Sequence, residues 1–488
     1  MSLIVNQCKW LYQEFGLSSL QNTGRDAWLI ILTRSCRMFA YGTNSLIIAL
    51  FFSSLKFSDT RIGLFMTLTL LGDVLLSVFL TLIADKVGRR RILFAGSFLM
   101  VCSGAVFALC ENFWILLLAA VVGVISATGG DFGPFRAIEE SILSHITTPK
   151  TRSDVLAWYV TTASLGSSVG TELSGRIIDF LQSRNGWTIV DTYHALFWIY
   201  SGMGVLNMAL TLLLSEKCEA KKAVEEDTGT SDFLLDDMDS ADESENNDES
   251  RSARSKAPKQ PVKKGWMSNF SQISRETRTI MYKLWFLLAV DSLADGMVPY
   301  SLTTYYIDKK FDLSKTALGN IISLSYFMSS CSTVFAGPLA RHLGLINTMV
   351  FTHLPSSAAV LFFPLPRGFP LTVALLLLRT TLNNMDQAPR SAFIAAVVKP
   401  EERTAVMGIT SMVRTLASST GPTVTGFLAG NQKFWIAFVA AGICRICYDL
   451  GLFAMFVNMK LHVHEVVEKE VSTSEREGDE EELREIRA

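Results

Sequence analysis

The chain has 488 residues, of which 49% are hydrophobic, and Phe alone contributes 31. Charged residues make up 18%, below the ~25% that is usual for soluble domains, which argues against a soluble globular protein. The formal net charge of −2 carries little information, because the distribution of charges decides the orientation of a membrane protein. The composition predicts an all-α polytopic membrane protein with room for about twelve spans.

The first half of the chain begins with an expected cytosolic N-terminal segment, residues 1–26, without an evident cleavable signal peptide. An N-terminal six-helix bundle is then predicted over residues 27–214. Its expected spans are Ala27–Ser53, Ile62–Ala84, Ile92–Leu109, Phe113–Leu143, Val155–Leu181 and His194–Leu214. The fourth span contains a Gly/Pro-rich break at residues 129–136, which is tolerable only where it faces protein or a wet cavity.

Residues 215–283 have a different character and are predicted to form a disordered cytosolic linker. An acidic tract, Asp232–Glu249, precedes a basic run, Arg251–Lys264, and such a segment cannot bury enough apolar area to offset its ordering entropy. A C-terminal six-helix bundle is predicted over residues 284–458, followed by a charged cytosolic tail at 459–488. Its expected spans are Leu284–Ile307, Ala317–Ala340, Leu345–Phe363, Leu371–Val398, Ala405–Leu428 and Phe434–Val457.

A short basic turn, Thr81–Arg91, lies between the second and third spans. Short basic loops resist translocation, so this turn and both chain termini are expected in the cytosol. Ala84-Asp85-Lys86-Val87-Gly88-Arg89-Arg90 resembles the loop between the second and third helices of the major facilitator superfamily, Gly-x-Leu-Ala-Asp-Arg-x-Gly-Arg-Arg/Lys. Thr81 stands where that family usually has glycine, and Ile83 where it has leucine.

The resemblance implies two six-helix bundles related by a pseudo-twofold axis, alternating access to a central site, and a monomer. It also implies a conformational latch at the turn, formed by Asp85, Lys86, Gly88, Arg89 and Arg90. The segment Gly130–Ser141 is similar to a fungal branch of the superfamily, so a fungal origin is expected.

The two halves repeat one another in sequence. Gly63 parallels Gly319 at an offset of 319 − 63 = 256, and Gly175 parallels Gly426 at an offset of 426 − 175 = 251. Two copies of a six-helix unit are typical of transporters whose halves rock about a site at their interface.

Ionisable residues inside the spans are the candidate functional groups. Each costs about 2.5–3.5 kcal/mol at a helix centre on insertion scales and therefore tends to face a cavity or a partner. The resemblance places the first, fourth, seventh and tenth spans around the central cavity. The substrate-cavity candidates on those spans are Arg37, Asp131, Arg136, Asp291 and Arg390.

Three carboxylates are candidates for proton coupling: Asp73, Asp295 and Asp386. Burial disfavours the charged form of a carboxylate, so such a group can exchange a proton near neutral pH. Asp73 and Asp295 have no cation three or four positions away, whereas Arg390 follows Asp386 by four. For Asp73, a salt bridge to Arg34 or Arg37 is an equal alternative.

Structural roles compete with these functional ones. Pairs of opposite charge one helical turn apart can neutralise each other, and three sets have this spacing: Arg136 with Glu139 and Glu140, Glu172 with Arg176, and Arg445 with Asp449. Arg37 and Arg390 suit an anionic group on a substrate. Alternatively, they balance the charges of Asp291 and Asp386.

The sequence therefore favours a secondary active transporter for a small polar solute, charged or zwitterionic, driven by protons and surrounded by lipid in the plasma membrane or in a vacuolar or other internal membrane. The alternatives are a drug/proton antiporter and a transporter-like nutrient sensor. No enzyme, nucleic-acid partner or cofactor is expected, and the sequence shows no nucleophile elbow or phosphate loop. No metal site is expected either, because His145, His194, His342 and His353 lack ligand partners at suitable spacing. The solute and the direction of transport are not indicated.

Overall fold

The computed structural model describes residues 17–123, 125, 134–148, 151–219, 275–398 and 402–456. Asp131, the central linker from residue 220 to 274 and the C-terminal tail lie outside the described residues. The side chains of Asp85 and Lys86 lie outside them as well.

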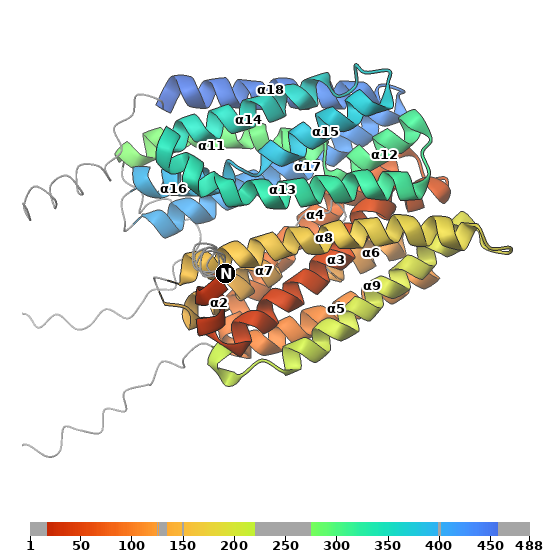
Figure 1. Cartoon of the computed structure of the whole chain (residues 1–488), viewed down its shortest axis with the longest axis horizontal. Helices are drawn as coiled ribbons and strands as arrows, with labels where there is room; N and C mark the ends of the chain where they lie inside the picture. The colour runs from red at the N-terminus through yellow and green to blue at the C-terminus, as the bar shows by residue number, and fades with distance from the viewer. Residues whose placement is uncertain are drawn as a thin grey trace, which may run out of the picture.

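The described residues form two helical bundles that lie side by side, the first in red to yellow and the second in green to blue (Figure 1). The N-terminal bundle consists of α2 (Leu17–Thr23), α3 (Arg25–Ser54), α4 (Asp59–Val87), α5 (Arg89–Leu109), α6 (Phe113–Val122), α7 (Pro134–Ile146), α8 (Arg152–Gln182), α9 (Ile189–Leu212) and the short helix η1 (Glu216–Cys218). As expected from the sequence, α6 and α7 occupy the two ends of the fourth span.

The C-terminal bundle repeats this layout. It consists of α11 (Arg275–Met297), α12 (Tyr300–Phe311), α13 (Lys315–Leu343), α14 (Leu345–Phe362), α15 (Phe369–Asn383), α16 (Gln387–Val397), α17 (Arg403–Gly430) and α18 (Phe434–Phe456). We call the end of the bundles at which α3 begins and α9 ends the linker end, and the opposite end the far end.

The seventh and tenth spans, expected as continuous helices, are both interrupted. α11 ends at Met297 and α12 begins at Tyr300, after Pro299, because proline cannot supply the helical hydrogen bond. The Arg379 guanidinium donates to the freed carbonyl of Val298 and, at 3.1 Å, to Thr303 Oγ1. A half-buried side chain thus satisfies the broken backbone, as a break at membrane depth requires.

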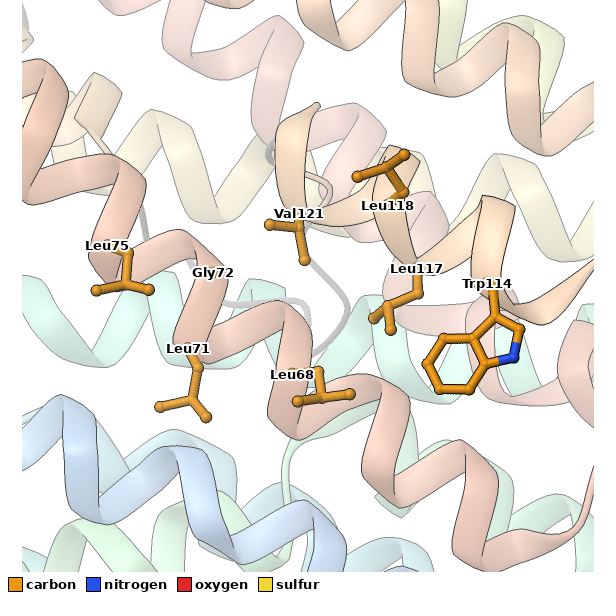
Figure 2. A pocket seen from close by; sticks show the side chains of 8 residues that line it. All are labelled: Leu68, Leu71, Gly72, Leu75, Trp114, Leu117, Leu118 and Val121. Carbon is orange, nitrogen blue, oxygen red and sulfur yellow. The ribbon is translucent and has the colours of Figure 1, made fainter.

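Length and apolar composition together single out four helices. Among the described residues, four helices are long and apolar enough to cross a membrane by composition alone: α5, α9, α14 and α18. Among the other helices, α3 and α4 contain the buried charges Arg37 and Asp73. Leu75 and Leu118, on α4 and α6, line an apolar groove of about 500 Å³ (Figure 2). We assign this groove to the lipid-facing surface, since its lining lacks charged groups.

Four glycines let the bundles touch backbone to backbone. A Cβ on Gly63 would lie 2.9 Å from Cα of Gly426, and a Cβ on Gly175 would lie 3.1 Å from Cα of Gly319. Such separations leave no room for a larger side chain. These are the four glycines that the internal repeat aligns, so α4 packs on α17 in the same way as α8 packs on α13.

Polar contacts between the bundles lie at the far end and near the centre. Asp59 accepts hydrogen bonds from Tyr305 Oη at 2.7 Å and from Lys309 Nζ at 2.9 Å. Asp179 accepts from the backbone N–H groups of Lys315 and Thr316, at 3.2 and 2.8 Å, and so caps α13 across the interface. These contacts hold the far ends of the bundles together.

Candidate functional site

A buried ion pair occupies the interior of the N-terminal bundle. Arg37 on α3 donates to both carboxylate oxygens of Glu139 on α7, at 2.9 and 2.6 Å, and both side chains are 1% exposed. Tyr159 Oη on α8 donates to the same carboxylate at 2.7 Å. A bidentate pair with a third donor is among the strongest arrangements available to buried charges, and the Glu139 carboxylate links α7 to α3 and α8.

Aromatic rings enclose this pair. The Arg37 guanidinium lies 4.4 Å from the ring centroid of Phe135, and that of Arg34 lies 3.9 Å from the ring centroid of Tyr159. Both distances suit cation–π attraction. Arg34 and Arg37 are therefore held by α7 and α8.

Asp73 lies at the middle of α4 with 2% exposure. Neither Arg34 nor Arg37 bonds it: Arg37 is directed to Glu139 and Arg34 to Tyr159. Within the described ranges no hydrogen-bond donor or cation bonds the Asp73 carboxylate, and its Oδ1 is fully enclosed. The salt-bridge alternative for Asp73 is thus not what the structure contains.

Two of the pairs expected from helical spacing are present. Arg136 Nε donates to Glu140 at 2.7 Å, and Arg176 donates to Glu172 at 2.5 Å. Glu139, the other acid expected near Arg136, belongs to the buried pair instead, because its position turns it inward toward α3. The Arg136–Glu140 pair is partly exposed, at 43% and 37%.

A larger charged cluster fills the C-terminal bundle. Arg390 on α16 bonds Asp386, one turn before it, and lies 3.5 Å from Asp291 on α11. Arg390 therefore balances both aspartates, which agrees with the structural alternative for this residue. The guanidinium is also 5.6 Å from the ring centroid of Tyr448.

The expected pair of Arg445 with Asp449 is wrong. Arg445 Nη1 on α18 lies 3.1 Å from Asp295 on α11, and Asp449 Oδ1 lies 2.7 Å from His353 Nδ1 on α14. Spacing along one helix allows a pair, but here both residues bond partners on neighbouring helices instead. Asp295, for which no nearby cation was expected along its own helix, thus has one from α18.

His353 is the residue that sequence reasoning missed. Its apolar surroundings in the sequence suggested a residue without partners, yet the ring contacts Asp449 and, at 2.6 Å, Arg445 Nη2. The sequence feature that could have indicated partners is the position of His353 inside a predicted span rather than at its end. Across the described residues, no group of three or more His, Cys, Asp or Glu side chains is arranged to hold a metal ion.

The two bundles carry related ion pairs of opposite polarity. Glu139 and Arg390 are separated by 390 − 139 = 251 residues, the offset that relates Gly175 to Gly426. In the N-terminal bundle the cation is on α3 and the acid on α7. In the C-terminal bundle Asp291 on α11 faces Arg390 on α16, so the repeat conserves the position of the pair while exchanging its charges.

The basic turn between α4 and α5 is tied to the end of the N-terminal bundle. Gly88 has φ of 107°, in the region that favours glycine. Glu219, just after η1, accepts hydrogen bonds from the backbone N–H groups of Arg89 and Arg90 at 2.7 and 3.2 Å. A carboxylate at the first turn of α5 satisfies orphan donors and complements the helix dipole.

Replacing Glu219 by alanine should therefore lower the free energy of unfolding by about 1 kcal/mol, as for loss of a helix cap. Chemical unfolding in mixed micelles would measure it. Glu216→Ala provides the control, since Glu216 lies one turn earlier and is exposed. Equal losses in the two variants would contradict a capping role for Glu219.

The two bundles repeat one topology, contain interrupted helices and gather charges in their interiors. This arrangement defines a polytopic membrane transporter rather than an enzyme. The sequence matches the Major Facilitator Superfamily over residues 30–282 and 284–485. The chain belongs to this family, and it is an integral membrane protein.

Relatives and solved structures agree. An uncharacterized membrane protein of Saccharomyces cerevisiae is 31% identical over 438 residues, covering 89% of this chain and 95% of the relative. The nucleoside transporter NupG has a TM-score of 0.62 at 14% identity, covering 90% of this chain and 100% of its own. A bacterial homologue of the human lysosomal transporter Spinster, inward-facing and occupied, has a TM-score of 0.64 at 13% identity, covering 88% and 95%. These structural likenesses show the fold.

Proposed function

We propose that the protein is a proton-coupled secondary transporter for a small polar solute, charged or zwitterionic, working by alternating access. The observation that carries the proposal is that the buried charges differ in whether they are paired. Arg37 and Arg390 are paired with acids, whereas Asp73 is enclosed without a bonded cation among the described residues. An enclosed carboxylate without a counter-charge is suited to binding and releasing a proton.

The contacts between the bundles support an inward-facing arrangement. We infer that the linker end is cytosolic, because the basic turn with Arg89, Arg90 and Arg91 lies there. The glycine contacts and the Asp59 and Asp179 hydrogen bonds then close the opposite side. The likeness to the inward-facing Spinster homologue is consistent with this orientation. Asp85, Lys86, Gly88, Arg89 and Arg90 remain the proposed latch of the other state.

Asp131, Arg136 and Asp291 remain candidates for the solute site, together with Asp295, whose side chain is 36% exposed. The experiment that tests the function is uptake of a broad metabolite mixture by vesicles that contain the purified protein, read by mass spectrometry with and without a pH gradient. Accumulation of one solute only with the gradient would support the proposal. Equilibration regardless of the gradient would contradict proton coupling.

Asp73→Asn should abolish gradient-driven accumulation of that solute while exchange across the membrane continues. The amide has nearly the same shape but cannot carry the proton. Asp312→Asn is the matched control, because Asp312 is exposed with φ of 47°, a conformation that Asn also adopts readily. Normal accumulation by the Asp73→Asn protein would remove this residue from the coupling mechanism.

A further inference from the structure

His353 lies in the interior of the C-terminal bundle, with 2% of its surface exposed. Its Nδ1 is 2.7 Å from Asp449 Oδ1, and its Nε2 is 2.6 Å from Arg445 Nη2. Ser357 Oγ donates to the second oxygen of Asp449 at 2.7 Å. Helices α14 and α18 are therefore joined by a continuous chain of polar contacts through the imidazole ring.

The partners of the ring define its protonation state in this structure. A guanidinium can only donate hydrogen bonds, so Nε2 must accept from Arg445 and carries no proton. Nδ1–H then donates to Asp449. The contacts thus require the neutral imidazole.

A second carboxylate lies near Nε2, the ring nitrogen that does not face Asp449. Asp291 Oδ1 lies 3.7 Å from His353 Nε2. Both Asp291 oxygens are enclosed, and neither has a hydrogen-bond partner among the described residues, although Arg390 lies 3.5 Å away. A proton on Nε2 would place two donors, Nε2–H and Arg445 Nη2, against each other, and Asp291 is the nearby acceptor that resolves the conflict.

Arg445 also has a second acceptor. Its Nη1 is 3.1 Å from Asp295, one turn from Asp291 on the same helix. When the ring is charged, Arg445 can keep Asp295 and its contact with Asn383 while losing the contact with His353. The rearrangement breaks no covalent bond and leaves each charge paired.

The charged and titratable groups around the ring come from five helices. α11 presents Asp291 and Asp295, and α18 presents Arg445, Tyr448 and Asp449. Asp386 and Arg390 flank the start of α16, and Arg414 on α17 is directed to Ser292 at 3.3 Å. Arg379 on α15 is directed to the break between α11 and α12. The ring itself is thus flanked by one carboxylate at each nitrogen and one arginine.

We propose that His353 is a proton-binding site, and that its protonation exchanges the Arg445–His353 contact for a His353–Asp291 ion pair. The link from this site to transport rests on the proposed function, but proton binding to the ring does not. Because Asp291 is on α11, the exchange would act on one of the interrupted helices. Protonation would thereby transmit a change from the outer helix α14 to the centre of the molecule.

The test is ¹⁵N NMR of the full chain, labelled at its six histidines and held in lipid nanodiscs, between about pH 5 and 8, the range of histidine switching. The signal that disappears in His353→Gln identifies the ring, and His145→Gln is the control that removes a different signal. We expect the neutral Nδ1–H form at the upper end and the imidazolium at the lower end. A ring that stays neutral throughout would overturn the proposal.

Asp291→Asn gives the second arm of the same experiment. The amide removes the negative charge opposite Nε2, so His353 should stay neutral over the range in which the wild-type ring becomes charged. Unchanged titration of the ring in Asp291→Asn would overturn the proposed exchange. This readout needs no solute: a titrating ring with no gradient-driven accumulation in vesicles would contradict proton coupling while leaving this site in place.

Discussion

Replacing Glu139 by glutamine is expected to lower the free energy of unfolding by about 3–5 kcal/mol, as for removal of one partner from a buried salt bridge. Arg37 would lose its bidentate acceptor inside the bundle, where it is 1% exposed, and Tyr159 would lose a charged acceptor. Chemical unfolding in mixed micelles would measure the loss. Gradient-driven uptake should fall with it, because three helices depend on this carboxylate.

The neighbouring glutamate supplies a matched control. Glu140→Gln removes the same charge one position away, from a partly exposed pair with Arg136, and should change the free energy of unfolding by no more than about 1 kcal/mol. If Glu139→Gln cost no more than Glu140→Gln, the buried pair would not be a stabilising element of the N-terminal bundle.

The reversed polarity in the C-terminal bundle suggests a rescue. The double variant Arg37→Glu with Glu139→Arg restores opposite charges on α3 and α7 and should be more stable than either single variant. The coupling between the two sites then follows from a double-mutant cycle, in which contacting residues differ from additivity by about 0.5–3 kcal/mol. Additive losses would show that the two positions do not interact.

The second large effect is expected for Gly175→Val. A side chain here would overlap the Lys315 carbonyl and approach Gly319, so α8 and α13 could no longer meet and the far end could not close. Transport should be lost while each bundle stays folded, because this contact lies between the bundles. The measurement is uptake together with labelling of a cysteine introduced at Thr67, which is buried at the interface where it bonds Thr423.

Labelling from the far side should rise about 5-fold or more, the scale of a coupling that shifts a conformational equilibrium. The native cysteines would be replaced beforehand, among them Cys102, Cys331 and Cys447, which are exposed in the described part of the chain. Gly202→Val is the control, since a Cβ on Gly202 meets nothing within 4 Å. Unchanged uptake and labelling in Gly175→Val would contradict a closing role for the glycine contact.

The sequence predicted the parts of the fold that depend on one helix at a time or on the repeat. Apolar runs placed the spans, and the offsets of 256 and 251 residues paired Gly63 with Gly319 and Gly175 with Gly426. In the structure Gly63 meets Gly426 and Gly175 meets Gly319, so each repeated glycine lies at an equivalent close helix crossing that requires glycine on both backbones. The Arg136–Glu140 and Arg176–Glu172 pairs could be predicted because one helical turn fixes their geometry.

The charged clusters could not be predicted in the same way. Whether Glu139 faces Arg136 or Arg37, and whether Arg445 faces Asp449 or Asp295, depends on the rotation of neighbouring helices about their axes. A buried charge takes the partner that best replaces its hydration, and that partner can be hundreds of residues away. The break before Tyr300 follows Pro299, but the side chain that satisfies its freed carbonyl, Arg379, comes from another helix.

The position of Arg445 and Asp449 on the last helix has a consequence for biosynthesis. Until α18 is made, Asp295 lacks its cation and His353 lacks the carboxylate that orients it. Each unpaired charge in the bilayer costs about 2.5–3.5 kcal/mol on insertion scales. In a nascent chain that ends before Phe434, the C-terminal bundle therefore lacks the charge partners that Arg445 and Asp449 provide. The C-terminal bundle can therefore complete its interior charge pairs only after the last span has been translated.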